Sequence, residues 1–302
     1  MKQYIDRKNL TQIFALSLGI FLICGSPTYA QQTKSFCPSK FAISKCFSSW
    51  TDIVPELASS NVIYLGETHD SELDHQNQLK IIQELYKRNP KIAIALEMFQ
   101  RPYQGVVDEY LAGKITEEEL VKKSEYQKRW GFSWKLYAPI LRFAKKNKLP
   151  VLATNTPAEV SRKVARQGLE SLTADERQWI PPFSEIRTDN EDYRKMVLAA
   201  FAEHQAAGHS KSADAERFFL VQVLWDETMA ETIANFVQAN PSHQVVVLAG
   251  QGHIIYGFGI PSRVERRLQG KVTQSTVLLS PSEEIAVLKD QPVANFIFEV
   301  TN

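Results

Sequence analysis

The sequence lacks the short motifs that identify several large classes of enzyme. It contains no Gly-x-Ser-x-Gly elbow, so a serine nucleophile of the α/β-hydrolase kind is not indicated. It contains neither a glycine-rich phosphate loop nor the Gly-x-Gly-x-x-Gly fingerprint of dinucleotide-binding folds. No repeat of solenoid length and no low-complexity tract is present. Nucleotide-dependent enzymes of these types and repeat proteins are therefore excluded.

Strong net charge and long hydrophobic runs are also missing. The 302 residues carry a formal net charge of +1, so no polyanionic partner such as nucleic acid is implied. Beyond residue 30, no apolar run approaches the roughly 20 residues that a membrane-spanning helix needs. Apolar residues make up 44% of the chain, which is enough to bury the core of one large domain over residues 50–302.

The first thirty residues have the composition of an export signal. Basic residues precede the apolar stretch Ile13–Ile23, and small residues follow up to Ala30. This pattern predicts a signal peptide over residues 1–30 that is cleaved after Ala30, and hence a periplasmic or lumenal protein. Cleavage would remove three basic residues and one acidic residue and leave a net charge of −1.

Cysteine is scarce, and each of the three cysteines has a specific interpretation. Cys24 lies in the signal region and would anchor the protein to a membrane if it were lipidated, although the bulky Ile23 before it is atypical of a lipidation signal. Cys37 and Cys46 lie in a polar lead over residues 31–49. In an exported chain, such a pair predicts a Cys37–Cys46 disulfide, and two free thiols are the alternative.

Four apolar runs of strand length are each followed by polar side chains. Two of them, Val62–His69 and Gln244–His253, pass through a glycine to a histidine three residues later. A third leads into Glu97, and the fourth, Leu149–Ala153, is followed by Thr154 and Asn155. Such runs are typical of strands buried on both faces, and sheets of this kind bind ligands beyond the carboxyl ends of their strands. We therefore expect an α/β fold with a central, largely parallel sheet flanked by helices. The side chains expected to converge in one cleft are Glu67, His69, Glu97, Asn155 and His253.

This set of side chains has two chemical interpretations. A histidine after one strand is more often a surface side chain than a functional one, but the repeated pattern together with Glu97 favours a functional cleft. His69, Glu97 and His253 could bind a divalent transition metal and leave positions open for water. Without a metal, Glu67, His69, Glu97 and His253 could activate water by general acid–base catalysis.

Between the strands, the sequence predicts amphipathic helices and a helical insertion. The insertion runs from Glu97 to Leu149 and contains the aromatic junction Arg129–Trp134, which is either core or a surface for a planar ligand. A basic helix over Ser262–Leu268 could meet an anionic ligand, with a solvated face as the alternative. Two further strands are expected over Thr273–Leu279 and Asn295–Val300, and their direction stays open.

Five motifs occur in a characteristic order between Asn61 and Leu268. They are Leu65-Gly-Glu-Thr-His-Asp70, Ala95-Leu-Glu-Met-Phe99, Arg129-Trp-Gly-Phe132, Ala153-Thr-Asn-Thr-Pro157 and Leu248-Ala-Gly-Gln-Gly-His253, the last followed by Tyr256-Gly-Phe-Gly-Ile-Pro261. Together they resemble the ChaN-like haem-binding uptake family, and more remotely the Tiki metalloproteases and the erythromycin esterases. The resemblance implies an exported α/β protein that binds haem, with a homodimer around the cofactor and an outer-membrane or transport partner.

The resemblance also implies roles for individual residues. The family is implied to hold haem iron through a tyrosine, which we expect to be Tyr256, with Tyr193 and Tyr103 as rivals. Trp130 would pack against the macrocycle and Arg263 would lie near the propionates. In the remote relatives, the positions that match His69, Glu97 and His253 are implied to be catalytic or metal-binding. No Cys-x-x-Cys-His stretch is present, so covalent haem attachment is not expected.

Two functions follow from these expectations. The first is an exported haem-binding protein in haem or iron uptake. The alternative is a metal-dependent or His/Glu-dependent hydrolase of esters or amides, so the sequence leaves open whether the protein is an enzyme.

Overall fold

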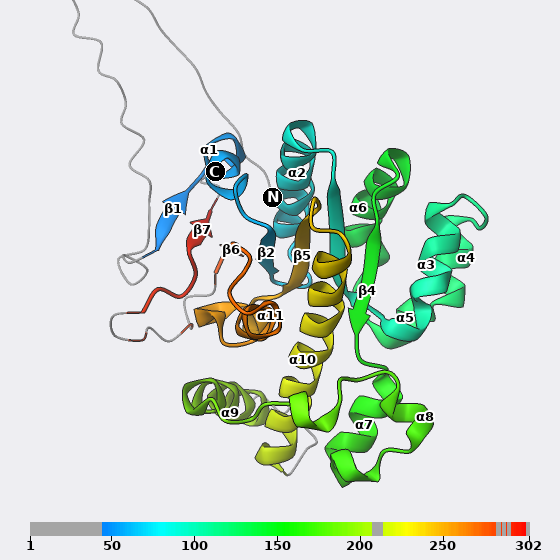
Figure 1. The fold of residues 1–302 in the computed structure, drawn as a ribbon, viewed down its shortest axis with the longest axis vertical. Helices are drawn as coiled ribbons and strands as arrows, with labels where there is room; N and C mark the ends of the chain where they lie inside the picture. The colour runs from blue at the N-terminus through cyan, green and yellow to red at the C-terminus, as the bar shows by residue number, and fades with distance from the viewer. Residues whose placement is uncertain (1–43, 207–213, 282–284, 286–287, 289–290, 300–302) are drawn as a thin grey trace, which may run out of the picture. The chain divides into compact units, whose positions relative to one another are not determined.

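A seven-stranded sheet forms the centre of the protein, and every pair of neighbouring strands is parallel (Figure 1). The computed structural model describes residues 44–206, 214–281, 285, 288 and 291–299. The strand order is β1-β7-β6-β2-β5-β3-β4. The strands are β1 Lys45–Phe47, β2 Val62–Glu67, β3 Ile92–Gln100, β4 Val151–Asn155, β5 Gln244–Gly250, β6 Gln274–Leu279 and β7 Phe296–Phe298. The expected α/β class is confirmed, and the last two strands prove to be parallel.

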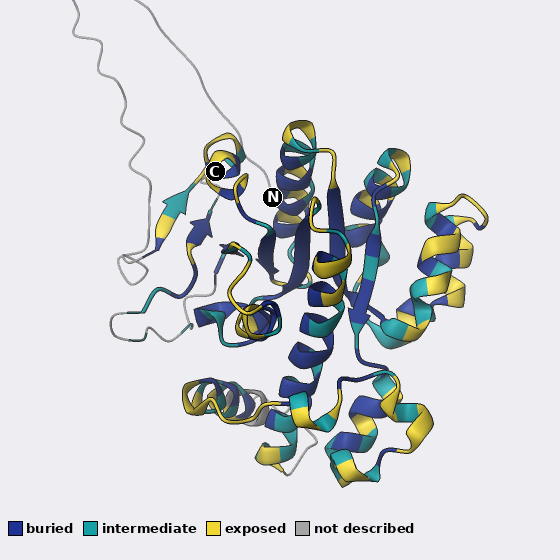
Figure 2. Cartoon of the chain, in the orientation of Figure 1, coloured by how far each residue is buried: buried dark blue, intermediate teal, exposed yellow. Residues whose placement is uncertain are grey.

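Strands β2, β5 and β3, which are neighbours in the sheet, are buried along their whole length (Figure 2). Successive strand residues point to opposite faces of a sheet. Accordingly, Ile63 and Leu65 of β2 belong to one hydrophobic core, whereas Val62 and Tyr64 belong to a second. Burial on both faces explains why these runs are continuously apolar and do not alternate with polar residues.

Helices cover both faces and supply the insertion. The first core packs against α1, α2, α6 and the insertion, and the second packs against α10 and α11. The helices are α1 Trp50–Leu57, α2 Glu72–Arg88, α3 Gln104–Leu111, α4 Glu117–Lys123, α5 Tyr126–Arg129, α6 Trp134–Asn147, α7 Ala158–Gln167, α8 Ala174–Arg177, α9 Glu191–Ala206, α10 Ala215–Ala239 and α11 Ile260–Leu268. Among the described residues, no helix is both long and apolar enough to cross a membrane.

Polar caps fix the helix ends where the sequence suggests them. The Ser71 hydroxyl accepts a hydrogen bond from the Asp74 amide at the start of α2. At the start of α4, Thr116 and Glu119 form a reciprocal capping box. Both caps satisfy amide groups that have no partner within the first turn of a helix.

The structure differs from the expectations at two strands. β3 continues to Gln100, so Glu97 lies within the strand and not after it, and the pairing with β4 shifts register between Leu96 and Gln100. Lys45–Phe47 lies in the expected polar lead but pairs with Phe296–Phe298 at the sheet edge. The folded domain therefore begins before residue 50, and the expected polar lead over residues 31–49 is too long.

Three predictions concern residues outside the described ranges. These are the signal peptide over residues 1–30, lipidation at Cys24, and the partner Cys37 of the expected disulfide. Cys46 itself lies in β1. All three stay predictions.

Candidate functional site

The carboxyl ends of β2 and β5 and the outer part of β3 bring the expected acids and histidines together. Glu67 and Gly250 are register partners at the ends of β2 and β5. Glu97 of β3 accepts a hydrogen bond from the Gly250 amide at 2.8 Å. A Cβ on Gly250 would lie 2.9 Å from His69 Nε2 and 3.8 Å from Glu97 Oε2, so glycine permits this close approach. Glu67, His69, Glu97 and His253 thus form the expected constellation.

His253 lies between two carboxylates. Its Nδ1 is 2.5 Å from Asp226 Oδ1, and its Nε2 is 3.3 Å from Glu97 Oε1. The second oxygen of Asp226 accepts a short hydrogen bond from the Tyr193 hydroxyl. Asp226 and Tyr193 are completely buried. A buried imidazole between two carboxylates is suited to carry a proton on both of its nitrogens.

His69 has a carboxylate of its own. Its Nδ1 is 3.0 Å from Glu67 Oε1. Tyr137 donates a hydrogen bond to the same oxygen at 2.5 Å, and Gln78 donates one to Glu67 Oε2 at 2.6 Å. The side chain of Glu67 is only 1% exposed, whereas that of His69 is 27% exposed. His69 is therefore the more accessible of the two histidines, and Glu67 fixes its orientation.

The charges of these groups reinforce one another. Burial lowers the pKa of His253, but the negative charges of Glu97 and Asp226 outweigh it and raise that pKa overall. Burial raises the pKa of Glu97, but the charge and the hydrogen bond of His253 lower it well below its ordinary value. Burial lowers the pKa of His69, but its hydrogen bond to Glu67 and the charge of Glu97 raise it overall. At neutral pH, Glu97 is therefore a carboxylate and His253 an imidazolium.

A cleft of about 310 Å³ opens beside this constellation. Glu97 lines it, whereas His69 and His253 are in contact with its surroundings but not among its lining residues. The other lining residues include Arg129, Trp130, Asn155 and Trp225. A larger hollow of about 580 Å³ lies on the insertion, beside Glu117 and Trp134, away from the strand ends.

Of the residues expected around haem, Trp130 lines this cleft, whereas Tyr256 and Arg263 do not. Trp130 packs against His69, with 4.8 Å between ring centroids, and joins the first core. Tyr256 belongs to the second core, 5.4 Å from the ring of Phe258, and is 9% exposed. Arg263 is 4% exposed and pairs with Glu227 at 3.3 Å. The alternative of a solvated face is wrong for Arg263, because its guanidinium group is buried against Glu227. A place for Arg263 near the haem propionates stays a prediction.

The expected metal site gains no support from the geometry. Within the described parts of the chain, no group of three or more His, Cys, Asp or Glu side chains is arranged to hold a metal ion. The distances instead describe hydrogen-bonded pairs, in which each histidine has its own carboxylate. Metal binding by His69, Glu97 and His253 stays a prediction.

Sequence reasoning missed the supporting residues that come from helices. Asp226 lies within α10, and Tyr137 lies within α6. Asp226 could have been suspected, because it and Glu227 interrupt the otherwise apolar face of the long helix expected over Ser212–Ala239. Acids in such positions are seldom buried without a charged or hydrogen-bonding partner. Tyr137 gave no comparable signal.

Comparisons with known proteins place this site in a family context. A family model described as haem-binding uptake, Tiki superfamily, ChaN matches residues 53–264. RETICULATA-RELATED 5, chloroplastic, from Arabidopsis thaliana is 26% identical over 260 residues, which are 80% of this chain and 34% of that protein. The chain thus spans about a third of the length of this curated relative.

Solved structures share the fold. ChaN of Campylobacter jejuni, solved with cofacially bound heme, has a TM-score of 0.61 at 20% identity, over 82% of this chain and 92% of that chain. The erythromycin esterase EreC in its open conformation has a TM-score of 0.44 at 13% identity, over 78% of this chain and 77% of that chain. The first likeness establishes a common fold, and the second is too distant to support an argument.

Proposed function

The chain belongs to the family of haem-binding uptake proteins of the Tiki superfamily that includes ChaN, and from this premise we propose that it binds haem and handles haem or iron after export. The family match and the cofacial heme of the Campylobacter jejuni protein support this proposal. A homodimer around the cofactor and a membrane transport partner are part of it. The central cleft, at about 310 Å³, is at the lower end of the range for small-molecule sites and does not suit a whole macrocycle.

The surroundings of the Tyr256 hydroxyl are the observation that supports haem binding. This hydroxyl is buried and approaches only the backbone of Leu288 among the described residues, so no charged side chain holds it. By contrast, the Tyr193 hydroxyl is already bound to Asp226, and the Tyr103 hydroxyl donates to Glu125 at 3.0 Å. Burial raises the pKa of Tyr256, so its phenol is neutral at pH 7 and would have to lose its proton to serve as an iron ligand. Tyr256 therefore fits the role of iron ligand better than either rival.

The strained backbone at Tyr256 agrees with a specific role. Its φ of 56° lies in the left-handed region, which non-glycine residues seldom adopt. The Tyr256 amide donates to the Val293 carbonyl at 2.7 Å, and this hydrogen bond holds the turn. Such strain is often kept where a side chain must be aimed at a ligand.

Replacement of Tyr256 by phenylalanine tests the haem proposal. We expect Tyr256→Phe to weaken haemin binding about tenfold or more, since a lost coordination bond of 1.4 kcal/mol already has that effect. The visible band of tyrosinate-ligated ferric haem should disappear as well. The measurement is a haemin titration of the full-length chain, followed by visible absorption.

Tyr103→Phe is the matched control, because it removes a hydroxyl from the more exposed rival. Its spectrum should equal that of the wild type. A tyrosinate band that persists in Tyr256→Phe and vanishes in Tyr103→Phe would identify Tyr103 as the iron ligand. No saturable haemin binding by the wild-type chain would refute the haem proposal itself.

A second function is favoured by the ionised Glu97 that lines the cleft beside two histidine–carboxylate pairs. In a hydrolase of esters or amides, His69 would accept a proton from water and Glu67 would hold its imidazole in place. The imidazolium of His253 would keep Glu97 charged and stabilise negative charge that develops nearby. This function does not depend on Tyr256.

Removal of His69 tests the hydrolase proposal. We expect His69→Gln to lower kcat/KM for p-nitrophenyl esters by about 10²–10⁴-fold, the usual contribution of a general base. His243→Gln is the control, because His243 lies at the opposite end of β5, next to Phe236. Haemin binding should stay unchanged in both variants. Equal rates in the wild type and His69→Gln would show that the constellation is only a scaffold.

A further inference from the structure

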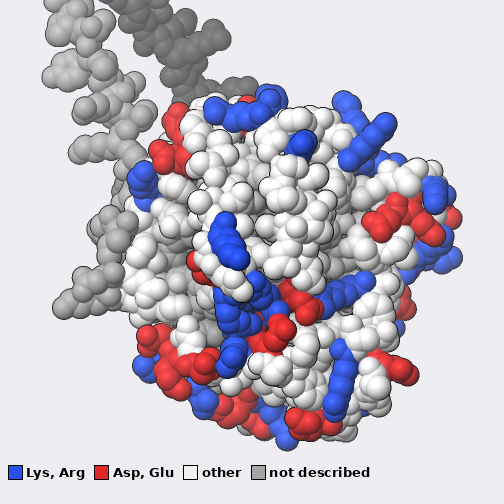
Figure 3. All heavy atoms as spheres, viewed as in Figure 1, with Lys and Arg blue, Asp and Glu red and all other residues white. Residues whose placement is uncertain are grey.

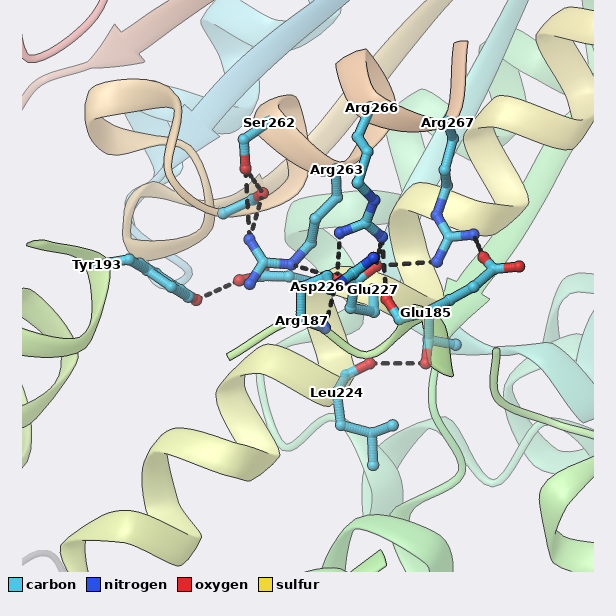
Figure 4. Close-up of polar contacts among 12 residues, drawn as sticks. Glu185, Arg187, Tyr193, Leu224, Asp226, Glu227, Ser262, Arg263, Arg266 and Arg267 are labelled. Atoms are coloured by element: carbon cyan, nitrogen blue, oxygen red, sulfur yellow. Dashed lines mark hydrogen bonds and ion pairs between the residues drawn. The ribbon is translucent and has the colours of Figure 1, made fainter. Parts of the chain in front are cut away.

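A buried glutamate on α10 gathers three arginines of α11 (Figure 4). Glu227 is completely buried. Arg263 lies 3.3 Å from its Oε1, while Arg266 and Arg267 donate to its Oε2 at 2.6 and 2.8 Å. Arg267 also pairs with Glu185. One carboxylate thus contacts three guanidinium groups, which is more positive charge than it can neutralise.

Arg187 adds a fourth positive charge to this cluster. Its backbone amide donates to Glu227 at 3.2 Å, while its side chain is exposed. Among the described residues, its guanidinium group has no ion pair. The cluster therefore contains four arginines and two glutamates and has two uncompensated positive charges. Positive charge concentrated at one place on a nearly neutral protein indicates an anionic ligand.

The excess charge faces a pocket of about 350 Å³. Six of its lining side chains can donate hydrogen bonds, whereas the single carboxylate, that of Glu185, is already paired with Arg267. The lining residues are Ser184, Glu185, Arg187, Ala234, Asn235, Gln238, Arg266 and Arg267. In Figure 3, basic and acidic side chains gather over the part of the molecule where α11 lies in Figure 1.

One donor group of Arg267 is left without a partner in the described part of the chain. The side chain of Arg267 is 90% buried, and its Nε has no hydrogen-bond partner among the described residues. A buried donor without a partner is costly unless water or a ligand satisfies it. Arg267 thus retains donor capacity after both of its ion pairs are counted.

We propose that this pocket binds a small oxygen anion with two negative charges, either a phosphate group or a pair of carboxylates. Planar guanidinium groups match the oxygens of both kinds of anion and form paired, charge-assisted hydrogen bonds. Arg187 and the exposed edge of Arg266 contact the anion, and the amides of Asn235 and Gln238 complete its donors. The Glu227 carboxylate holds Arg266 and Arg267 in position through its Oε2. The site is separate from Tyr256 and from the cleft at Glu97.

Calorimetric titration of the full-length chain with inorganic phosphate and, separately, malonate tests this site. We expect saturable binding of one anion per chain that weakens as salt is added. Arg187→Ala should weaken binding about tenfold, since it removes one charge-assisted donor from an exposed position. Gln238→Glu should abolish binding, because it places a negative charge in the wall without disturbing the core.

Arg142→Ala is the matched control, because Arg142 is exposed and lies on the insertion. It should bind the anion like the wild type. Phosphate binding without malonate binding would identify a phosphate ligand, and the reverse would identify a dicarboxylate. The proposal is overturned if neither anion binds saturably, or if Arg142→Ala weakens binding as much as Arg187→Ala. Haemin titration of Gln238→Glu should be unchanged, which separates this site from the proposed haem function.

Discussion

Glu227→Gln is expected to lower the free energy of unfolding by about 3–5 kcal/mol, the usual effect of removing one partner from a buried ion pair. The substitution preserves the shape of the side chain and removes its charge. Arg263, 4% exposed, and Arg267, 10% exposed at its side chain, would then share a buried region with far less negative charge. Urea denaturation followed by circular dichroism measures the change.

Glu56→Gln is the control for this experiment. Glu56 pairs with Lys45 at 3.2 Å, but both side chains are well exposed, so its loss should change stability by less than about 1 kcal/mol. If the two variants lose equal stability, Glu227 does not organise the arginines. The arginines of α11 would then have to be stabilised by their contacts with backbone carbonyls, such as those of Arg263 with Phe258 and Gly259.

Glu97→Gln is expected to cost a similar amount of stability, about 3–5 kcal/mol near pH 6, because it leaves the His253 imidazolium with one buried counter-charge instead of two. The same change should lower the pKa of His253, which nuclear magnetic resonance of its ring protons would measure. In the wild type, Glu97 and Asp226 raise that pKa to about 10 against the effect of burial. A His253 pKa that does not move in Glu97→Gln would contradict this account of the charges.

The pH dependence of stability has a defined sign at both groups. The pKa of His253 is raised from 6.5 to about 10, so its contribution is complete below pH 6.5 and is lost as pH rises toward 10. The pKa of Glu97 is lowered from 4.5 to about 2, so its contribution is complete above pH 4.5 and is lost as pH falls toward 2. Urea denaturation from pH 3 to pH 10 should therefore show maximal wild-type stability between pH 4.5 and pH 6.5. For Glu97→Gln, the free energy of unfolding should vary less with pH.

The strand ends could be predicted from sequence because their chemistry and their position are encoded locally. An apolar run fixes a buried strand, and the residues that follow it must lie at one edge of the sheet. Glu67, His69 and His253 were placed in this way. Glu97 was found by the same logic, although its strand continues past it to Gln100.

The roles of site residues on helices could not be predicted from sequence, because these roles depend on packing between distant segments. Asp226 reaches His253 only because α10 packs against the second face of the sheet, and no local pattern specifies that packing. Arg263 illustrates the same limit. A basic helix has the same sequence pattern whether its arginines face water or a buried Glu227 on another helix. The parallel direction of β6 and β7 was open for a related reason, since short apolar runs do not encode strand direction.

Strand β5 lies between β2 and β3 in the sheet, although it follows both of them far along the chain. The nascent polypeptide therefore cannot complete the middle of the sheet until Gln244–Gly250 has been synthesised. Topologies dominated by such distant pairings fold slowly, and their unpaired strand edges are exposed to aggregation in the meantime. For a protein that we propose is exported, slow completion of the sheet would leave more time for translocation before the chain folds.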